Sequence, residues 1–363
     1  MKKAQIRVIS WLLLLSLLLG GCAVEQPVNT DGTTIQVTTQ ATEVTQEATE
    51  VIQEATLQTQ GIDAVTQPTQ QVTETPVVTQ PVIQETEPPV QTQPTEAAKP
   101  SVPVGSSFQI HFIDVGQADA ALILCDGKTM LIDGGNKADS DVMYTYLKKN
   151  NITYLDYVVG THAHEDHIGG IPGALNCATA GTVYIPQKTN TTKAYKDFIT
   201  AANNKAERIV IPKVGDTFSL GSAQCTILAV DTENDYNNSS IVMRIVYGNT
   251  SFMFTGDAER EVENHILDSG ANVRSTVLKV GHHGSSSSTN YRWLREVAPE
   301  YAVICVGKDN TYGHPTENTL SRLRDAEVTT FRTDLQGDII CTSDGNTVSF
   351  TTARNKDIDT LTK

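Results

Sequence analysis

Short apolar runs separated by polar turns begin at Phe108 and continue almost to the end of the 363-residue chain. Runs typical of strands lie at 107–114, 120–125, 129–132, 154–160, 181–185, 208–211, 224–229, 240–247, 250–255, 275–280, 301–305, 328–332, 337–342 and 347–351. Helical spacing of apolar residues occurs at 141–150, 257–269, 292–297 and 316–326. Strands with interspersed helices predict a layered α/β architecture, and the clustered early strands disfavour a simple doubly wound parallel sheet.

The first 22 residues have the pattern of an export signal. Three basic residues, Lys2, Lys3 and Arg7, precede an apolar run at 11–19 that is too short to span a bilayer comfortably. The run ends in LGGC at Cys22, which resembles the bacterial lipobox, in which this cysteine is lipidated. We therefore expect a lipoprotein anchored to the outer face of the cell membrane through Cys22. The alternative is an ordinary cleaved signal with a chance cysteine.

Residues 23–107 differ from the segments on both sides. They contain nine of the 14 prolines, no Phe, Tyr or Trp, and short near-repeats rich in Thr, Gln, Glu and Val. A stretch without aromatic side chains buries too little apolar surface to form a core. We interpret it as a disordered stalk that serves as a spacer. Residues 108–363 then form one folded domain, long enough for a sizeable core.

The net charge of −15 is divided unevenly along the chain. The stalk accounts for −10 and the folded domain for −8, while the first 22 residues carry +3. An acidic domain argues against sequence-blind binding of nucleic acid through net charge alone. One basic segment, 187–213, would guide a nucleic-acid backbone if it lies near a site, and is otherwise a solvated helix face. Its bases are Lys188, Lys193, Lys196, Lys205, Arg208 and Lys213.

The cysteines after Cys22 give little evidence of a special role. They are odd in number, isolated, and mostly inside apolar strand-like runs, and no CxxC pair exists. We predict small buried core residues rather than a disulfide framework or a zinc site. They are Cys125, Cys177, Cys225, Cys305 and Cys341.

Six of the eight histidines fall into three polar clusters that follow predicted strands. The first cluster, at 161–170, reads THAHEDHIGG. His162 and His164 are two residues apart, so they face one side of an extended strand end, and Asp166 and His167 lie on the turn that follows. One pair can bind one metal ion and the other pair a second. Imidazole and carboxylate ligands suit Zn²⁺, Mn²⁺ or Fe²⁺.

This cluster resembles the signature of the metallo-β-lactamase-like hydrolase superfamily. The resemblance implies a four-layer αβ/βα sandwich with the metals at one edge. Residues 131–135, LIDGG, match the family's first motif, which implies that Asp133 orients the histidines from outside the ligand shell. Residues 252–257, FMFTGD, match the strand that ends in a metal-bridging aspartate, here Asp257. Taken alone, either aspartate also suits a turn or a helix N-cap.

Two later clusters, LKVGHHGS at 278–285 and YGHP at 312–315, supply the other three of these six histidines. In related phosphodiesterases an intermediate histidine contacts the phosphate and a later one binds the second metal. That order implies His314 as a metal ligand and His282 or His283 as the catalytic acid or substrate contact. The reverse order stays open.

Hydroxyl-rich segments are candidates for contacts with a phosphate. Ser285 and Ser286 precede a predicted helix, which suits an anion, although an ordinary Ser-rich loop is an equal alternative. Asn238 and Ser239 belong to the segment DYNNSS at 235–240 and are also expected to contact the substrate.

The segment 235–240 stands where many members of the superfamily have another histidine, since the chain has none between His167 and Asp257. With NNSS there, and with the two later clusters, residues 108–350 resemble a particular branch. That branch is the hydrolase-like domain attached to bacterial competence DNA-uptake channels, and its stand-alone secreted relatives. One ligand fewer implies a weakly held or water-completed metal at His162 and His164, which favours Mn²⁺ over Zn²⁺.

The resemblance implies a hydrolase with two divalent metal ions, Mn²⁺ or Zn²⁺. We expect metal-assisted hydrolysis of a phosphodiester or nucleic acid, with Asp166 as both ligand and catalytic residue. The membrane is a partner only through the lipid anchor, no protein partner can be inferred, and we expect a monomer. The alternatives are a hydrolase that opens a β-lactam or lactone ring, and a tethered module that binds metals without catalysis.

Overall fold

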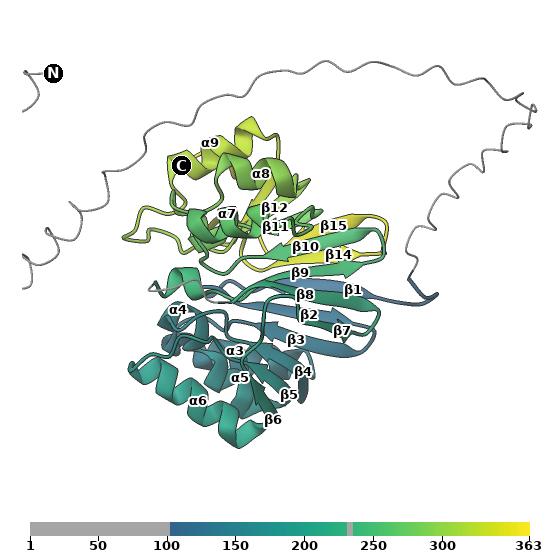
Figure 1. The fold of residues 1–363 in the computed structure, drawn as a ribbon, viewed down its shortest axis with the longest axis vertical. Coiled ribbons are helices and arrows are strands. Elements are labelled where there is room, and N and C mark those ends of the chain that lie inside the picture. Colours follow the sequence, from purple (N-terminus) through teal and green to yellow (C-terminus); the bar gives the residue numbers. More distant parts are fainter. Residues whose placement is uncertain (1–101, 231–234) are drawn as a thin grey trace, which may run out of the picture. The chain divides into compact units, whose positions relative to one another are not determined.

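The computed structural model describes residues 102–230 and 235–363 (Figure 1). The predicted export signal at 1–22, with its Cys22 lipid site, and almost all of the predicted stalk lie outside the described residues. Within the described part of the chain, no helix has the length and apolarity needed to cross a membrane. The first strand begins at Phe108, where the sequence pattern changes, and the domain boundaries themselves stay predictions.

Two facing β-sheets form the centre of the described structure. The larger sheet has the strand order β15 (Val348–Thr352), β14 (Ile339–Ser343), β1 (Phe108–Phe112), β2 (Ala121–Cys125), β3 (Lys128–Ile132), β4 (Tyr154–Val159), β5 (Thr179–Tyr184) and β6 (Ala206–Val210). The smaller sheet has the order β13 (Thr329–Arg332), β12 (Tyr301–Ile304), β11 (Val277–Lys279), β10 (Thr250–Phe254), β9 (Val242–Tyr247), β8 (Ala223–Ala229) and β7 (Thr217–Leu220). Antiparallel strands in each sheet continue into a parallel run, β3 to β6 in one and β10 to β13 in the other.

Aromatic and aliphatic side chains fill the space between the two sheets. The ring of Phe108 in β1 lies 5.0 Å from that of Tyr247 in β9 and 4.7 Å from that of Phe252 in β10, measured between centroids. Phe112 and Phe254 stack in the same way at 6.0 Å. Because side chains alternate along a strand, the opposite faces of the sheets carry other apolar residues outward to the helices.

Helices cover the outer face of each sheet (Figure 1). Those on the larger sheet are α3 (Ser140–Lys149), α5 (Ile171–Cys177) and α6 (Lys193–Lys205). Those on the smaller sheet are α7 (Arg260–Asp268), α8 (Tyr291–Val297) and α9 (Glu317–Asp325). Shorter helical turns are η1 (Lys137–Asp139), α4 (Glu165–Ile168), η2 (Asn237–Ser239), η3 (Gly281–Gly284) and α10 (Thr333–Gln336). Helix, sheet, sheet and helix form four layers, so the predicted αβ/βα sandwich is confirmed.

The strands and longer helices predicted from the apolar pattern are all present, with their ends shifted by a few residues. The pattern missed α5, α6 and β7. Of the residues of α6, only Ala194, Tyr195, Phe198 and Ala202 are buried, so its apolar stripe is too narrow to stand out. The helix predicted to start at Asp257 begins only at Arg260, which leaves Asp257 in the turn after β10.

The predicted character of the cysteines is confirmed for those that the structure describes. All have free thiols, and all are buried except Cys177, which is half-buried. They act as small apolar residues of the core.

Gly169 and Gly170, which directly follow the first histidine cluster, pack closely against the backbone after β3. A Cβ atom at Gly170 would lie 1.9 Å from the carbonyl oxygen of Gly134, and one at Gly169 would lie 2.4 Å from the amide nitrogen of Lys137. The amide of Gly134 donates a hydrogen bond to the carbonyl oxygen of His167 at 2.7 Å. The two glycines after the histidines are therefore required for packing.

The substitution Gly170→Ala is expected to lower the free energy of unfolding by about 2 kcal/mol or more, because the methyl group would overlap the backbone. Urea unfolding followed by circular dichroism measures the loss. Gly215→Ala is the control. Its Cβ would meet no atom of the described residues within 4 Å, so it costs only the strain of φ +88°, roughly 1 kcal/mol. Equal losses for both variants would contradict the packing requirement.

Candidate metal centre

The predicted metal ligands lie at the carboxyl ends of parallel strands from both sheets. β3 and β4 are parallel neighbours in the larger sheet, and β10 and β11 in the smaller. Asp133 follows β3, the residues 161–167 follow β4, Asp257 follows β10, and His282 and His283 follow β11. The two sheets therefore bring segments that are far apart in the chain to one edge of the sandwich.

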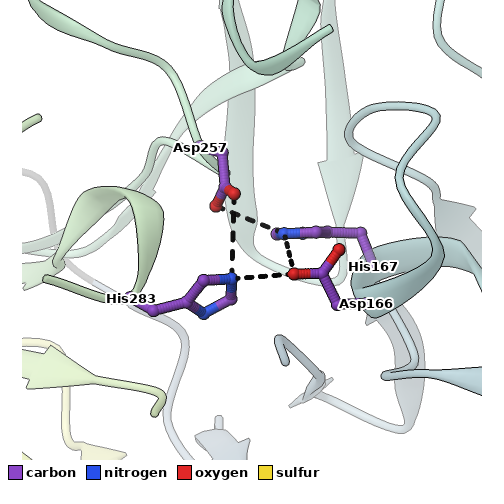
Figure 2. A group of neighbouring side chains, drawn as sticks. All are labelled: Asp166, His167, Asp257 and His283. Carbon is purple, nitrogen blue, oxygen red and sulfur yellow. Dashed lines mark ion pairs between the residues drawn. The ribbon is translucent and has the colours of Figure 1, made fainter. Parts of the chain in front are cut away.

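Asp166, His167, Asp257 and His283 form a compact group (Figure 2), in which one ligand atom of each residue lies within 4.8 Å of the others. His167 Nε2 lies 3.2 Å from Asp257 Oδ1 and 3.9 Å from Asp166 Oδ2. His283 Nε2 lies 3.3 Å from Asp166 Oδ2 and 3.7 Å from Asp257 Oδ2. The side chains come from α4, from the turn after β10 and from η3, and they point toward one another.

The polar atoms at the centre of this group are buried without a hydrogen-bond partner among the described residues. They are His167 Nε2, Asp257 Oδ1 and His283 Nε2. A buried polar atom without a partner costs free energy, and a divalent cation would bind all three atoms at once. Two imidazoles and two carboxylates are also ligands suited to Zn²⁺ or Mn²⁺. The residues present therefore fit a divalent metal ion.

His162 and His164 form a second donor pair beside this group. His162 Nε2 lies 3.1 Å from His164 Nδ1 and 3.9 Å from Asp257 Oδ2. Ser240 ends the segment that replaces the family's additional histidine. Its hydroxyl lies 3.3 Å from His162 Nδ1 and accepts the amide N–H of Asp257 at 3.0 Å. Asp257 thus borders both donor sets, and the cluster is compatible with two metal ions.

Charges within the cluster shift the ionisation of its members. Burial and the neighbouring His167 hold the pKa of His162 well below its ordinary value, so its imidazole is neutral. Burial opposes a charge on His283, but Asp257 and Asp119 raise its pKa to about 10. The surrounding carboxylates likewise raise the pKa of His167 against burial. Protons on two imidazoles thus balance the carboxylates when no cation is present.

Asp133 supports His167 from the side opposite the cluster. Its side chain is 1% exposed and accepts hydrogen bonds of 2.8 Å each from the amide and the hydroxyl of Thr161. Its Oδ2 also lies 2.8 Å from His167 Nδ1. A bond at Nδ1 leaves Nε2 of the same ring as the atom that faces the cluster. These contacts are the ones that an orienting carboxylate makes.

Asp119 supports His283 in a similar way, although it was not among the predicted site residues. Its Oδ1 lies 3.2 Å from His283 Nδ1, which also lies 3.0 Å from the carbonyl oxygen of Cys305. Lys279 is 4% exposed, and its Nζ lies 2.8 Å from Asp119 Oδ2. Burial opposes ionisation, but Lys279 and His283 lower the pKa of Asp119 to about 2. The sequence does carry a signal for both residues, because Asp119 directly precedes the apolar run 120–125 and Lys279 interrupts the apolar run 275–280.

His282 lies at the edge of the cluster, with 22% of its side chain exposed. Its Nε2 lies 3.6 Å from Asp257 Oδ2, and its Nδ1 lies 3.2 Å from Glu259 Oε1. Glu259 also accepts a 2.8 Å hydrogen bond from the hydroxyl of Ser287. The ring is therefore oriented by a carboxylate that the sequence pattern did not identify.

Three candidate site residues have left-handed backbone conformations. The φ angle is 57° at Asp133, 51° at His282 and 52° at His283. A conformation of this kind costs roughly 1–3 kcal/mol in a residue other than glycine and persists where the surroundings enforce it. At His282 and His283 this conformation belongs to the η3 turn, which carries both imidazoles.

An open pocket of about 310 Å³ adjoins the compact group. It is lined by Gln117, His164, Glu165, Asp166, Asn237, Asp257, His282, His283, Tyr312 and His314. The His314 ring lies 5.5 Å from that of His282, and burial together with His282 lowers the pKa of His314 to about 4. The structure thus groups His283 with the other ligand atoms and leaves His314 on the pocket wall. This is the reverse of the order that the resemblance implied.

The two residues of the 235–240 segment that were predicted to contact the substrate do not line this pocket within the described structure. Asn238 Oδ1 accepts the amide N–H of Glu259 at 3.0 Å. Ser239 is fully buried, and its hydroxyl donates to the carbonyl oxygen of Tyr236 at 2.7 Å. Both side chains hold the η2 turn in place, and the neighbouring Asn237 lines the pocket instead.

Ser285 and Ser286 are also absent from the pocket lining in the part of the chain that the structure describes. The Ser285 hydroxyl lies 2.9 Å from that of Ser287, and the carbonyl oxygen of Ser286 accepts a hydrogen bond from Arg322 at 3.1 Å. The sequence left two interpretations of equal weight, an anion site ahead of a helix and an ordinary Ser-rich loop. Here the Ser285 hydroxyl and the Ser286 carbonyl group make contacts within the protein, as expected of an ordinary Ser-rich loop.

One residue of the basic segment 187–213 contacts a neighbour of the cluster. Lys188 Nζ lies 5.0 Å from the centroid of the Tyr236 ring, which lies 5.5 Å from the ring of His164. Lys193, in contrast, pairs with Asp197 on α6 at 2.7 Å. The segment therefore places one cation over Tyr236, which is a neighbour of His164, while part of the segment is the solvated helix face of the alternative interpretation.

Residues 113–308 match the family described as the metallo-beta-lactamase superfamily. The match covers more than half of the chain, and the four-layer fold and the His/Asp cluster agree with it. The chain belongs to the metallo-β-lactamase superfamily and has the fold of its metal-dependent hydrolases.

Three relatives confirm the predicted likeness to the competence branch. ComE operon protein 3 of Bacillus subtilis is 29% identical over 256 residues, covering 65% of this chain and 33% of that protein. Competence protein ComA of Neisseria gonorrhoeae is 32% identical, covering 62% and 30%. Recombination protein 2 of Haemophilus influenzae is 30% identical, covering 60% and 26%. The chain thus spans about a third or less of the length of each relative.

Asp133→Asn is expected to weaken metal binding by about ten- to a hundredfold. One amide oxygen cannot replace two carboxylate oxygens that bind both Thr161 and His167. Competition with a chromophoric chelator for Zn²⁺ measures the affinity. Asp141→Asn, on the exposed side of α3, is the control and should leave it unchanged. Wild-type affinity in the Asp133 variant would show that this carboxylate does not orient a ligand.

Proposed function

We propose that this chain is a metal-dependent phosphodiesterase that cleaves nucleic acid at the outer face of the cell membrane. The observation that carries the proposal is the group of Asp166, His167, Asp257 and His283, whose buried ligand atoms adjoin an open pocket. When bound, divalent cations activate water as a nucleophile and neutralise charge on phosphate oxygens. The pocket leaves room for a substrate next to the cluster.

Two donor sets divide the ligands, and Asp257 belongs to both. We assign one ion to His162, His164 and Asp257, and the other to Asp166, His167, His283 and Asp257. The second set replaces His314 by His283, because the ligand atoms of His283 and of the three other residues lie together. The first set has one ligand fewer than many superfamily members, so we expect its ion to be held more weakly.

His282 is our candidate for proton transfer to the leaving oxygen. Its Nε2 lies near Asp257 at the pocket, and its Nδ1 faces Glu259, which fixes the orientation of the ring. A positioned imidazole is the group most often used for such a transfer. His314 has a pKa near 4 and is therefore neutral at pH 7, so it serves as a hydrogen-bonding group of the pocket wall.

A nucleic-acid substrate is supported by the relatives and by the missing histidine. The relatives are named for competence and recombination, processes that act on DNA. The lack of a histidine between His167 and Asp257 counts against a β-lactam or lactone hydrolase. Since the domain itself is acidic, binding of a polyanion must depend on the cations and on local bases such as Lys188.

The location is proposed from the export signal and its cysteine. Cys22→Ser is expected to release the protein from the membrane, because a lipid anchor can form only on the thiol. Immunoblots of the membrane fraction and the culture medium measure the change, with Cys177→Ser as the control that stays with the membrane. Membrane retention of the Cys22 variant would contradict lipid anchoring.

Asp257→Asn is expected to reduce hydrolysis of bis(p-nitrophenyl) phosphate and of single-stranded DNA at least about a hundredfold. Loss of a residue outside the ligand shell already costs ten- to a hundredfold, and Asp257 borders both donor sets. Rates are measured on protein loaded with Mn²⁺ or Zn²⁺, and Asp141→Asn should keep the wild-type rate.

Other outcomes separate the alternatives. If the loaded wild type leaves both phosphodiesters intact, the proposal is wrong. Ring opening of nitrocefin would then support a β-lactam hydrolase. Metal binding without turnover of any of these substrates would support a non-catalytic module.

A further inference from the structure

One aromatic side chain stands out at the rim of the pocket. Tyr312 is 71% exposed, more than any other aromatic residue that the structure describes, and it lines the pocket. The rest of the lining is made of imidazoles, carboxylates and amides. An apolar ring that stays in water at the mouth of a polar pocket is an unused contact surface.

A series of ring contacts connects Tyr312 with the metal cluster. The centroids of His283 and His282 are 6.2 Å apart, and those of His282 and His314 are 5.5 Å apart. Tyr312 stacks on His314 at 5.7 Å, with 27° between the planes. One face of Tyr312 is therefore occupied by His314. The rings of His314 and His282 lie between Tyr312 and His283.

The loop that carries Tyr312 is held in one conformation. Asn310 accepts the amide N–H of His314 at 3.0 Å, and its Nδ2 donates to the carbonyl oxygens of Gly307 and His314 at 2.9 and 2.6 Å. The amide of Gly307 donates to Oε1 of Gln117, another residue of the pocket lining, at 3.0 Å. Tyr312 is thus positioned before any ligand binds.

A second tyrosine near the cluster, Tyr236, is not part of the described pocket lining and has a different environment. Tyr236 lies 5.5 Å from His164, but it is only half-buried and the ammonium group of Lys188 lies over its ring at 5.0 Å. A positive charge therefore covers the Tyr236 ring, which is not a bare aromatic face. Among the residues that line the described pocket, Tyr312 therefore supplies the exposed stacking surface, and the metal ligands lie in the same lining.

We propose that Tyr312 is a platform on which a base of the substrate stacks, so that the site prefers diesters that carry nucleobases. The inference rests on the proposed function, because a phosphodiester at the cluster is what brings a base to the rim. Every nucleobase has a flat face, and stacking on an aromatic side chain requires a base that is not paired and stacked in a duplex. The preferred ligand is therefore single-stranded.

Binding measurements test this without relying on cleavage. Fluorescence anisotropy compares two labelled, phosphorothioate-linked oligomers of equal length in Mn²⁺ buffer, one of thymidines and one of abasic sugars. We expect wild-type protein to bind the thymidine oligomer about tenfold more tightly. Tyr312→Ala should abolish the difference and Tyr312→Phe should keep it. Tyr144→Ala, an exposed tyrosine on α3 outside the pocket lining, should also keep it.

Equal or undetectable binding of both oligomers by the wild type would overturn the inference, as would an unchanged preference in Tyr312→Ala. The proposed hydrolysis is tested by cleavage assays, whose outcome is independent of these binding measurements. A protein that binds bases through Tyr312 but cleaves no diester would refute the phosphodiesterase, while one that cleaves both kinds of diester equally well and shows no preference in binding would refute the platform.

Discussion

The carboxylates buried at this edge of the sandwich need a positive partner, either protonated imidazoles or divalent cations, and this need determines how the edge is built. Asp257 is 2% exposed and faces His162, His167, His282 and His283. Without metal, protons on His167 and His283 balance its charge, and several polar atoms are left without partners. A buried charge is tolerated only when it is paired. The surrounding features, including strained turns and the tight glycine contact at Gly170, hold these groups together against that cost.

The supporting residues connect the two halves of the fold. Asp133 holds His167 within the half built on the larger sheet, whereas Asp119, which precedes β2 in that sheet, reaches His283 at the end of β11 in the other. Lys279 of β11 in turn neutralises Asp119. The position of one half of the cluster relative to the other is therefore fixed by buried ionic contacts as well as by apolar packing. Metal affinity and the docking of the two sheets should depend on each other.

The sequence pattern predicted those parts of the fold and of the site whose geometry follows from spacing along the chain. Apolar runs predicted the strands, and the residues 161–167 are so close together that their approach at a strand end follows from local structure. Contacts between the halves were not predictable in this way. Asp119 acts on Lys279 and His283 through the packing of the two sheets, which local spacing does not determine. Glu259 reaches His282 because β10 and β11 are neighbours in one sheet, which local spacing does not determine either. The roles of His283 and His314 were left open for the same reason, because the left-handed turn at η3 directs His283 toward Asp166. The hydroxyl-rich loops were candidates for substrate contacts, but the hydroxyls of Ser239 and Ser285 make hydrogen bonds within the protein.

The metal content of the protein tests the central claim most directly. Elemental analysis of wild-type protein, incubated with Mn²⁺ or Zn²⁺ and then desalted, measures the number of ions retained per chain. Two donor sets sharing Asp257 predict about two divalent ions per chain. When a chelator is added at rising concentration, the ion at His162 and His164 should be removed first. Fewer than one ion per chain with either metal would show that the buried charges at this edge are balanced by protons alone.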